Sequence, residues 1–243
     1  MDYSGVGDPG LFNLAQKQID RLLAFRGYGN PNARFWFVGM EEGGIPNSND
    51  LRIRADMFDS TEDLAKSHTN FQSHNMSKLV PTWRLMSSIV GRIKGEPNWW
   101  SKDFAREYQQ NRLGKPGDET YLTEILPLPK RGINDWPYGE LFGSPKEYQV
   151  KVLPDRRDHL RNEYKEALLK PEFVFCYGKG LRGEHRNIFD FIDFRSEMDD
   201  AIEWGSNQHS VFILTKMFGY GRLGFTEDFV DRLCSFALTK SPK

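Results

Sequence analysis

Hydrophobic and polar positions follow two different periods along the chain. Four short apolar runs, over residues 34–39, 120–126, 173–177 and 210–215, have the length and composition of buried strands. Apolar positions three and four apart predict helices over residues 11–26, 81–93 and 158–170, and a last helix that starts at Thr226. Strands that alternate with helices predict an α/β fold, a three-layer αβα sandwich with a central, mostly parallel four-stranded sheet.

The boundaries of these elements have their own signals. Pro81 and Thr226 are suited to the starts of helices, and Pro127 and Pro129 are expected to end the second strand. Residues 45–79 are polar and irregular, and they are too many for an ordinary connection. We therefore expect one domain over residues 1–243, with a long lid-like insertion at about 45–79.

Composition excludes several classes of protein. Two cysteines, Cys176 and Cys234, are too few for a disulfide framework or a cysteine-ligated metal centre, which favours a reducing, cytoplasmic setting. The N-terminus lacks the pattern of a secretory signal, and no apolar run is long enough for a membrane span, so no membrane partner is expected. A formal net charge of −1 gives no global attraction for nucleic acid.

The local distribution of charge changes this picture. Ligands of parallel α/β sheets bind beyond the carboxyl ends of the strands. The segments after the last three predicted strands, "PLPKRG", "YGKGLRGEHR" and "TKMFGYGRLG", are basic and have only Glu184 as an acid. They mix cations for phosphates with side chains that can wedge between bases. The candidate DNA-binding residues are Lys130, Arg131, Lys179, Arg182, Lys216, Met217, Tyr220 and Arg222.

The segment after the first predicted strand is different, because "FWFVGMEEGGIP" places Glu41 and Glu42 side by side in a glycine-rich turn. The two residues are either solvated acids in a tight turn or part of a catalytic site. The order of "GMEEGG", "TEILPLP", "YGKG" and "TKMFGYGR", each after a strand, resembles the uracil-DNA glycosylase superfamily over nearly the whole chain.

The resemblance assigns roles to particular residues. "GMEEG" is similar to the family's "GMNPG", which puts Glu41 at the water-activating position and Glu42 where proline is common. "TEILPL" is similar to "HNCFPL", which puts Glu124 at the base-reading asparagine. "TKMFGYG" lies where "HPS" is expected, so Met217 or a neighbour replaces the histidine. Two of the three signature residues therefore differ from the family pattern.

The resemblance implies a monofunctional DNA glycosylase that needs no metal or other cofactor. Its partner would be double-stranded DNA with one nucleotide flipped out, since a paired base cannot reach the site. The acid pair Glu41 and Glu42 would supply the catalytic carboxylate, which stabilises oxocarbenium character on the sugar and orients the attacking water. Thr123, and the aromatic residues Phe71 and Phe58, are further candidates for contacts to the base.

Glu124 bears on the identity of the base. A carboxylate accepts hydrogen bonds and suits the N4 amino group of cytosine, and a protonated carboxyl could also donate to the ring N3. The favoured substrate is a cytosine derivative such as glucosylated hydroxymethylcytosine in phage DNA, which is excised by an anti-phage branch of the superfamily. The expected product is an abasic site.

The sequence is compatible with two other functions. The chain could be a uracil-DNA glycosylase with divergent motifs, or a catalytically inactive module of the same fold that binds modified DNA. Glu124 could be an edge residue paired with a lysine or arginine. His68 and His74 lie six apart with no further ligand pattern, so we expect packing or DNA contact and no metal site. "GKGLRG" lacks the spacing of a P-loop, so no nucleotide cofactor is expected. The sequence does not specify protein partners.

Overall fold

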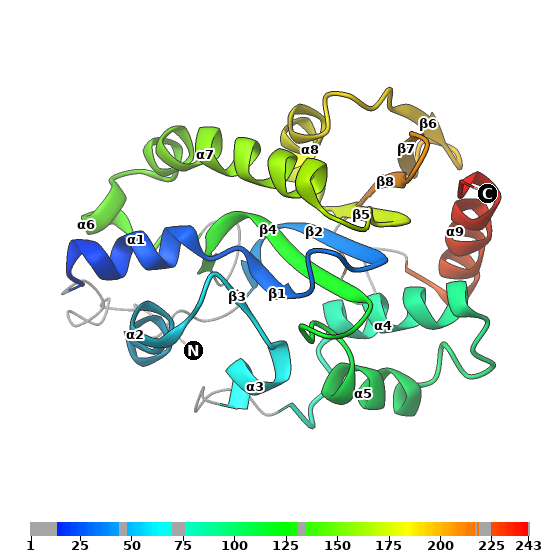
Figure 1. Cartoon of the computed structure of the whole chain (residues 1–243), viewed down its shortest axis with the longest axis horizontal. Helices are drawn as coiled ribbons and strands as arrows, with labels where there is room; N and C mark the ends of the chain where they lie inside the picture. Colours follow the sequence, from blue (N-terminus) through cyan, green and yellow to red (C-terminus); the bar gives the residue numbers. More distant parts are fainter. Residues whose placement is uncertain are drawn as a thin grey trace, which may run out of the picture.

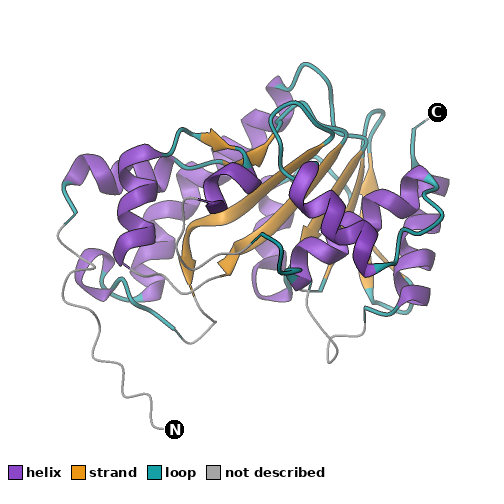
Figure 2. Ribbon diagram, turned by 90° about the horizontal axis from the view of Figure 1, so that it is seen from below, coloured by secondary structure: helices purple, strands orange, loops and turns teal. Residues whose placement is uncertain are grey.

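The computed structural model describes residues 14–43, 48–69, 76–130, 135–216, 218 and 225–242, without the side chains of residues 48–50 and 179. In this part of the chain one sheet of eight strands lies between two layers of helices (Figures 1 and 2). The predicted α/β class is therefore confirmed. None of the described helices combines the length and the apolar character that a membrane crossing requires.

The sheet is larger and less parallel than predicted. The order of its strands is β3-β1-β4-β2-β5-β8-β7-β6. The four predicted strands form the centre, and β4, β2, β5 and β8 pair in parallel. Antiparallel pairs join β1 to β4, β7 to β8 and β6 to β7. The strands are β1 (Gly27–Gly29), β2 (Phe35–Gly43), β3 (Thr61–Glu62), β4 (Thr120–Lys130), β5 (Phe173–Tyr177), β6 (Arg195–Glu197), β7 (Ile202–Ser206) and β8 (Val211–Thr215).

The helices cover both faces of the sheet (Figure 1). On β2, Phe35 and Phe37 pack into a core shared with α4, α5 and α9, whereas Trp36 and Val38 pack into a second core under α1, α7 and α8. Burial on both faces explains the continuous apolar run of this strand. The described helices are α1 (Gln16–Ala24), α2 (Ser48–Met57), α3 (Leu64–Thr69), α4 (Pro81–Lys94), α5 (Lys102–Asn111), α6 (Gly139–Phe142), α7 (Pro145–Glu166), α8 (Arg182–Ile188) and α9 (Glu227–Lys240), and a short 3-10 turn, η1, lies at Lys179–Leu181.

Several predicted boundaries are confirmed, and one helix begins earlier than predicted. Helix α4 begins with Pro81, and the side chain of Thr226 accepts a hydrogen bond from the first turn of α9. Helix α7 begins at Pro145, well before the predicted residue 158. Its start is a capping box in which Ser144 and Glu147 satisfy each other's backbone amides.

Strands β2 and β4 run further than predicted at their carboxyl ends. Strand β2 continues through the acidic pair to Gly43, so Glu41 and Glu42 lie in the strand and the predicted turn is wrong. Strand β4 passes through Pro127 and Pro129, which do not end it. Proline is tolerated there because β1 pairs with β4 only as far as Thr123, which leaves one side of β4 without a strand partner.

The predicted irregular lid at about 45–79 is also wrong over residues 48–69. This segment forms α2, β3 and α3, and β3 extends the sheet by pairing with β1. Leu51 and Ala55 of α2 and Leu64 of α3 are at most 2% exposed, so the segment belongs to the hydrophobic core.

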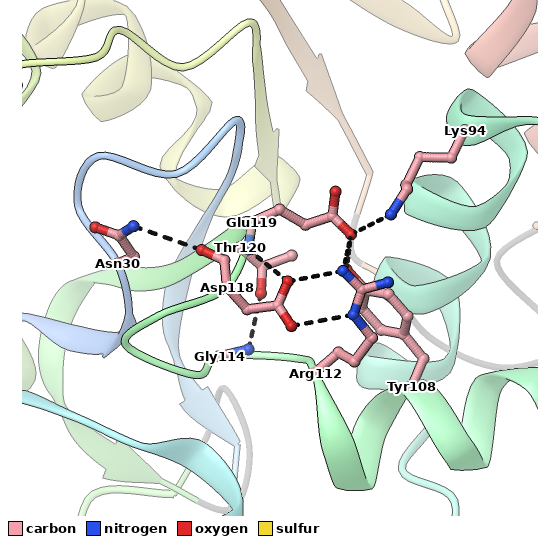
Figure 3. Close-up of polar contacts among 8 residues, drawn as sticks. All are labelled: Asn30, Lys94, Tyr108, Arg112, Gly114, Asp118, Glu119 and Thr120. Atoms are coloured by element: carbon pink, nitrogen blue, oxygen red, sulfur yellow. Dashed lines mark hydrogen bonds and ion pairs between the residues drawn. The ribbon is translucent and has the colours of Figure 1, made fainter.

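A polar cluster fastens α4 and α5 to the amino end of β4 (Figure 3). Glu119 accepts hydrogen bonds from Lys94 at 2.6 Å and from Tyr108 at 3.1 Å. Arg112 forms two hydrogen bonds, of 3.0 and 2.9 Å, with the carboxylate of Asp118. These charges neutralise one another at the amino end of β4, whereas the acidic pair of β2 lies near the carboxyl ends of the strands. The cluster therefore has a structural role.

Candidate active site

Glu42 of β2 takes part in a buried ion pair. Its two carboxylate oxygens each accept a hydrogen bond of 2.6 Å from the guanidinium of Arg54, and the side chains of Arg54 and Glu42 are 8% and 17% exposed. Tyr28 donates from 3.3 Å, and Nε2 of His68 lies 3.8 Å from Oε1. Burial alone would raise the pKa of Glu42, but the charge and hydrogen bonds of Arg54 lower it below its ordinary value. Glu42 therefore fastens α2 to the sheet as a charged, fully engaged carboxylate.

Glu41 lies in a second ion pair at the same end of the sheet. Its Oε1 is 3.0 Å from Nζ of Lys130, and the side chains of Glu41 and Lys130 are 16% and 10% exposed. The two residues come from the carboxyl ends of neighbouring strands, where the register of β2 against β4 shifts between Glu41 and Gly43. Burial raises the pKa of Glu41, although Lys130 opposes the rise. A carboxylate held by a lysine in this way is a suitable acceptor for a water molecule.

Glu124 of β4 has a different environment, built on its strand neighbour Gly39. The two residues are opposite each other in the register of β2 and β4. A side chain at Gly39 would place its Cβ 1.9 Å from Oε2 of Glu124 and 2.5 Å from the hydroxyl of Tyr177. The glycine therefore leaves a gap in the sheet face, and Glu124 and Tyr177 meet in that gap from the flanking strands β4 and β5.

The two oxygens of Glu124 differ in their contacts. Oε1 accepts a hydrogen bond of 2.8 Å from the Tyr177 hydroxyl, whereas Oε2 is buried and has no hydrogen-bond partner among the described residues. Burial raises the pKa of Glu124 to about 8, the hydrogen bond from Tyr177 opposes this, and the charges of Glu42 and Glu41 add to it. The raised pKa of Glu124 favours its protonated form at neutral pH. Glu124 is thus a carboxylic acid with a hydroxyl to donate.

A small cavity of about 40 Å³ adjoins these groups. Glu42 and Glu124 line it, together with apolar and aromatic residues that include Phe25, Tyr28, Trp83, Met86 and Tyr177. This volume holds a few water molecules at most. A nucleobase is several times larger than a water molecule, so its entry requires part of this wall to move outward.

Two predicted base contacts are occupied by the protein itself. Thr123 lines the cavity, but it is 1% exposed and its hydroxyl donates to the carbonyl of Arg26 at 2.5 Å. Phe58 is 5% exposed, packs on the ring of Phe25 at 5.4 Å, and is not part of the cavity wall. Both residues therefore support the site from behind. The third candidate, Phe71, lies outside the described residues.

The basic segments predicted to bind DNA are partly neutralised by acids of the protein. Lys130 is paired with Glu41, and Arg182 lies 2.9 Å from Glu203 of β7, which Arg186 also contacts at 2.6 Å. Nζ of Lys216 lies 5.2 and 5.1 Å from the ring centroids of Phe225 and Phe229. Arg131, Met217, Tyr220, Arg222 and the side chain of Lys179 lie outside the described part of the chain. A role in DNA binding remains a prediction for all of these residues.

The sequence interpretation missed several residues of the site. Tyr28, Arg54 and Tyr177 surround the carboxyl groups, but none of them was a candidate. A signal for Arg54 was present, because Leu51, Arg54, Ala55 and Phe58 follow helical spacing and all four are at most 7% exposed. Tyr177 shares strand parity with Phe173 and Phe175, which places it on the face of the sheet that α4 covers.

Neither metal-ligating groups in the described part of the chain nor the two sequence comparisons add to the interpretation of the candidate site. Within the described residues, no histidine, cysteine and acidic side chains form a group of three or more that could hold a metal ion. A scan of the chain against protein-family models produced no match, and a search of curated proteins found no similar sequence. The site is therefore interpreted from its own geometry. It combines an ion-paired carboxylate, a buried carboxyl whose pKa is raised, and an aromatic cavity at the carboxyl ends of parallel strands.

Proposed function

We propose that this protein is a DNA glycosylase that hydrolyses the N-glycosidic bond of a cytosine derivative flipped out of double-stranded DNA, and that it leaves an abasic site. The observation that carries the proposal is the carboxyl of Glu124, which is buried beside an aromatic cavity with Oε2 unpartnered in the described structure. A buried polar group without a partner is costly unless a ligand completes its hydrogen bonds.

Glu41 is the proposed catalytic carboxylate. It lies on the strand next to Glu124, and its ion pair with Lys130 holds it near the carboxyl end of β2. Cleavage of an N-glycosidic bond develops positive charge on the sugar, which a carboxylate at this position stabilises while it orients the attacking water. Glu42, the other predicted catalytic residue, forms an ion pair with Arg54 and is proposed to hold the carboxyl end of β2 in place.

Glu124 is proposed to read the base. In its protonated form the carboxyl accepts at Oε1 and donates at Oε2, which matches the N4 amino group and the N3 acceptor of cytosine. Uracil has an acceptor at O4 and a donor at N3, the reverse order. Glucosylated hydroxymethylcytosine in phage DNA is the substrate proposed within this class, since its Watson–Crick edge is that of cytosine.

The fold and the cavity wall support the same proposal. The four central parallel strands direct their carboxyl ends toward Glu41, Glu124 and Tyr177, in the arrangement proposed from the resemblance to the uracil-DNA glycosylase superfamily. Flipping a nucleotide costs a few kcal/mol, which stacking on Tyr28, Trp83 or Tyr177 and contacts to phosphates would offset.

The experiment is a base-excision assay on duplexes that contain one uracil, one hydroxymethylcytosine or one glucosylated hydroxymethylcytosine. The wild-type protein is expected to create alkali-labile sites in the cytosine derivatives. Glu41→Gln is expected to lose excision by a factor of at least roughly a hundred and to keep DNA binding. Glu107→Gln, in an exposed glutamate of α5, is the matched control and is expected to retain full activity.

Each alternative gives a distinct result. Full activity of Glu41→Gln would remove Glu41 from the mechanism. Cleavage restricted to uracil would indicate a uracil-DNA glycosylase with divergent motifs. Retardation of modified DNA on a gel, without abasic sites, would indicate a binding module.

A further inference from the structure

The position of Tyr177 is strongly constrained. Its side chain is 3% exposed, and its ring stacks on Phe218 with centroids 4.5 Å apart and planes inclined by 11°. From β5 the hydroxyl reaches the gap above Gly39 and meets Glu124 of β4. The tyrosine therefore crosses the intervening strand β2 in one fixed conformation, and its hydroxyl has one orientation relative to the carboxyl.

This contact decides which oxygen of Glu124 carries the proton. Burial and the neighbouring Glu124 raise the pKa of Tyr177 well above its ordinary value, so the hydroxyl keeps its hydrogen and donates it. The carbonyl oxygen of a carboxylic acid is a stronger hydrogen-bond acceptor than its hydroxyl oxygen, so Oε1, which receives the bond from Tyr177, is the carbonyl oxygen of the protonated acid. The proton is left on Oε2.

We propose that Tyr177 determines the base preference of the site by fixing the order of acceptor and donor on Glu124. The inference rests on the proposed glycosylase function and makes it more specific. The accepted base has an unprotonated ring nitrogen next to an exocyclic amino group, as cytosine derivatives have. Without the tyrosine hydroxyl the proton can reside on either oxygen, and a base with the reverse order is then accepted as well.

The expected size of the effect follows from the cost of a mismatched pair. A base with the reverse order presents a donor to Oε2 and an acceptor to Oε1, and each leaves a buried group unsatisfied. One such group costs about 1–3 kcal/mol, so the wild-type protein is expected to prefer the cytosine edge by roughly ten- to a hundredfold.

The test measures binding, so that it does not depend on catalysis. The probes are two duplexes, each with a single 2′-fluoro nucleotide that resists cleavage. The base of this nucleotide is hydroxymethylcytosine in one duplex and uracil in the other, and it is mismatched in both. Tyr177→Phe keeps the ring stacked on Phe218. In this variant the ratio of the affinities for the two duplexes is expected to fall by about tenfold or more. Tyr108→Phe is the matched control, since Tyr108 is a buried tyrosine that donates to Glu119 at the other end of the strand (Figure 3). It is expected to keep the preference.

A second variant tests the protonation state. In Glu124→Gln the amide oxygen can accept from Tyr177 and the amide nitrogen can donate from the position of Oε2, the same order as in the acid. The variant is therefore expected to prefer the cytosine edge at every pH from 6 to 9. The wild-type preference is expected to decline above about pH 8 as Glu124 ionises. The charged or titratable groups that face Glu124 are Glu41 and Glu42 on β2, Arg156 on α7 and Tyr177 on β5.

The outcomes separate this inference from the proposed function. An unchanged preference in Tyr177→Phe, a loss of preference in Glu124→Gln at all pH values, or a wild-type protein without preference would each overturn the inference. Preferential binding without excision of any base would overturn the glycosylase function and leave the role of Tyr177 standing. ¹³C NMR of the Glu124 carboxyl checks that the variant has lost only this hydrogen bond. The pKa of Glu124 is expected to be higher in Tyr177→Phe, because the hydrogen bond from Tyr177 lowers it in the wild type.

Discussion

Replacing Glu124 by glutamine is expected to remove a pH dependence of stability that the wild-type protein has between about pH 5 and pH 8. Burial raises the pKa of this carboxyl from an ordinary 4.5 to about 8 in the folded protein. Between these values the folded state holds a proton that the unfolded state has released. The contribution of Glu124 to stability is therefore complete below pH 4.5 and is lost as the pH rises through 8.

The magnitude follows from the same two values. Each pH unit in this interval lowers the free energy of unfolding by about 1.4 kcal/mol, so the full interval corresponds to about 5 kcal/mol. This is an upper limit, because water entry around the ionised carboxyl reduces the cost. His185 has the opposite effect below its ordinary 6.5, since burial lowers its pKa to about 4. The histidine is common to both proteins, so the difference between them isolates Glu124.

The assay is urea unfolding of the wild type and of Glu124→Gln at several pH values from 5 to 9. The variant is expected to gain stability relative to the wild type as the pH rises, by at least about 2 kcal/mol from pH 5 to pH 9. A constant difference between the two proteins over this range would mean that Glu124 has an ordinary pKa. The interpretation of Glu124 as a protonated donor would then be refuted.

Urea unfolding also measures three further substitutions, two in the site and one in the turn between β6 and β7. Gly39→Ala is expected to cost about 1–3 kcal/mol and to displace the Glu124 carboxyl, because the new Cβ would lie 1.9 Å from Oε2; wild-type stability would contradict the close approach. Glu42→Gln replaces the charged partner in the two 2.6 Å hydrogen bonds of the buried Arg54 guanidinium by a neutral amide and is expected to cost about 3–5 kcal/mol. The control, Asp103→Asn in an exposed pair, is expected to cost less than about 0.5 kcal/mol, and an equal loss in both would refute the special role of Glu42. Asp199→Gly is expected to stabilise the protein by about 1 kcal/mol or less, because this aspartate has a φ of 55°, and destabilisation would show that its side chain outweighs the backbone strain.

The central strands could be predicted from the sequence because their apolar runs are long enough to be recognised. Each of the four is buried on both faces, so its composition alone distinguishes it from the polar segments. Strands such as β1, "GYG", and β6, "RSE", have three residues each, too few for any period to appear. These strands form through hydrogen bonds to their neighbours, which sequence patterns do not specify.

The error over residues 48–69 has a physical origin in Arg54. A charged residue on the inward face interrupts the apolar stripe of α2, so the segment looks irregular and polar. Its burial depends on the Glu42 carboxylate, which lies on another element. The environment of Glu124 could not be predicted from the sequence either, because it depends on the absence of a side chain at Gly39 on the neighbouring strand.

The positive charge of the basic segments after the strands was overestimated for a related reason. Charges counted within each loop leave out the acids that approach from other elements, such as Glu203 of β7 for Arg182 and Glu41 for Lys130. Even Glu184, the one acid within these loops, pairs with Arg157 of α7. Pairing between loops is a property of the tertiary structure, whereas the sequence reveals only which charges are present.

The measurement that tests the central proposal most directly is mass spectrometry of the products from a duplex with one glucosylated hydroxymethylcytosine. The proposal predicts release of the free modified base and a DNA strand lighter by that base and heavier by one hydroxyl, the aldehyde form of an abasic site. An intact strand after prolonged incubation, with protein that still binds the duplex, would contradict it.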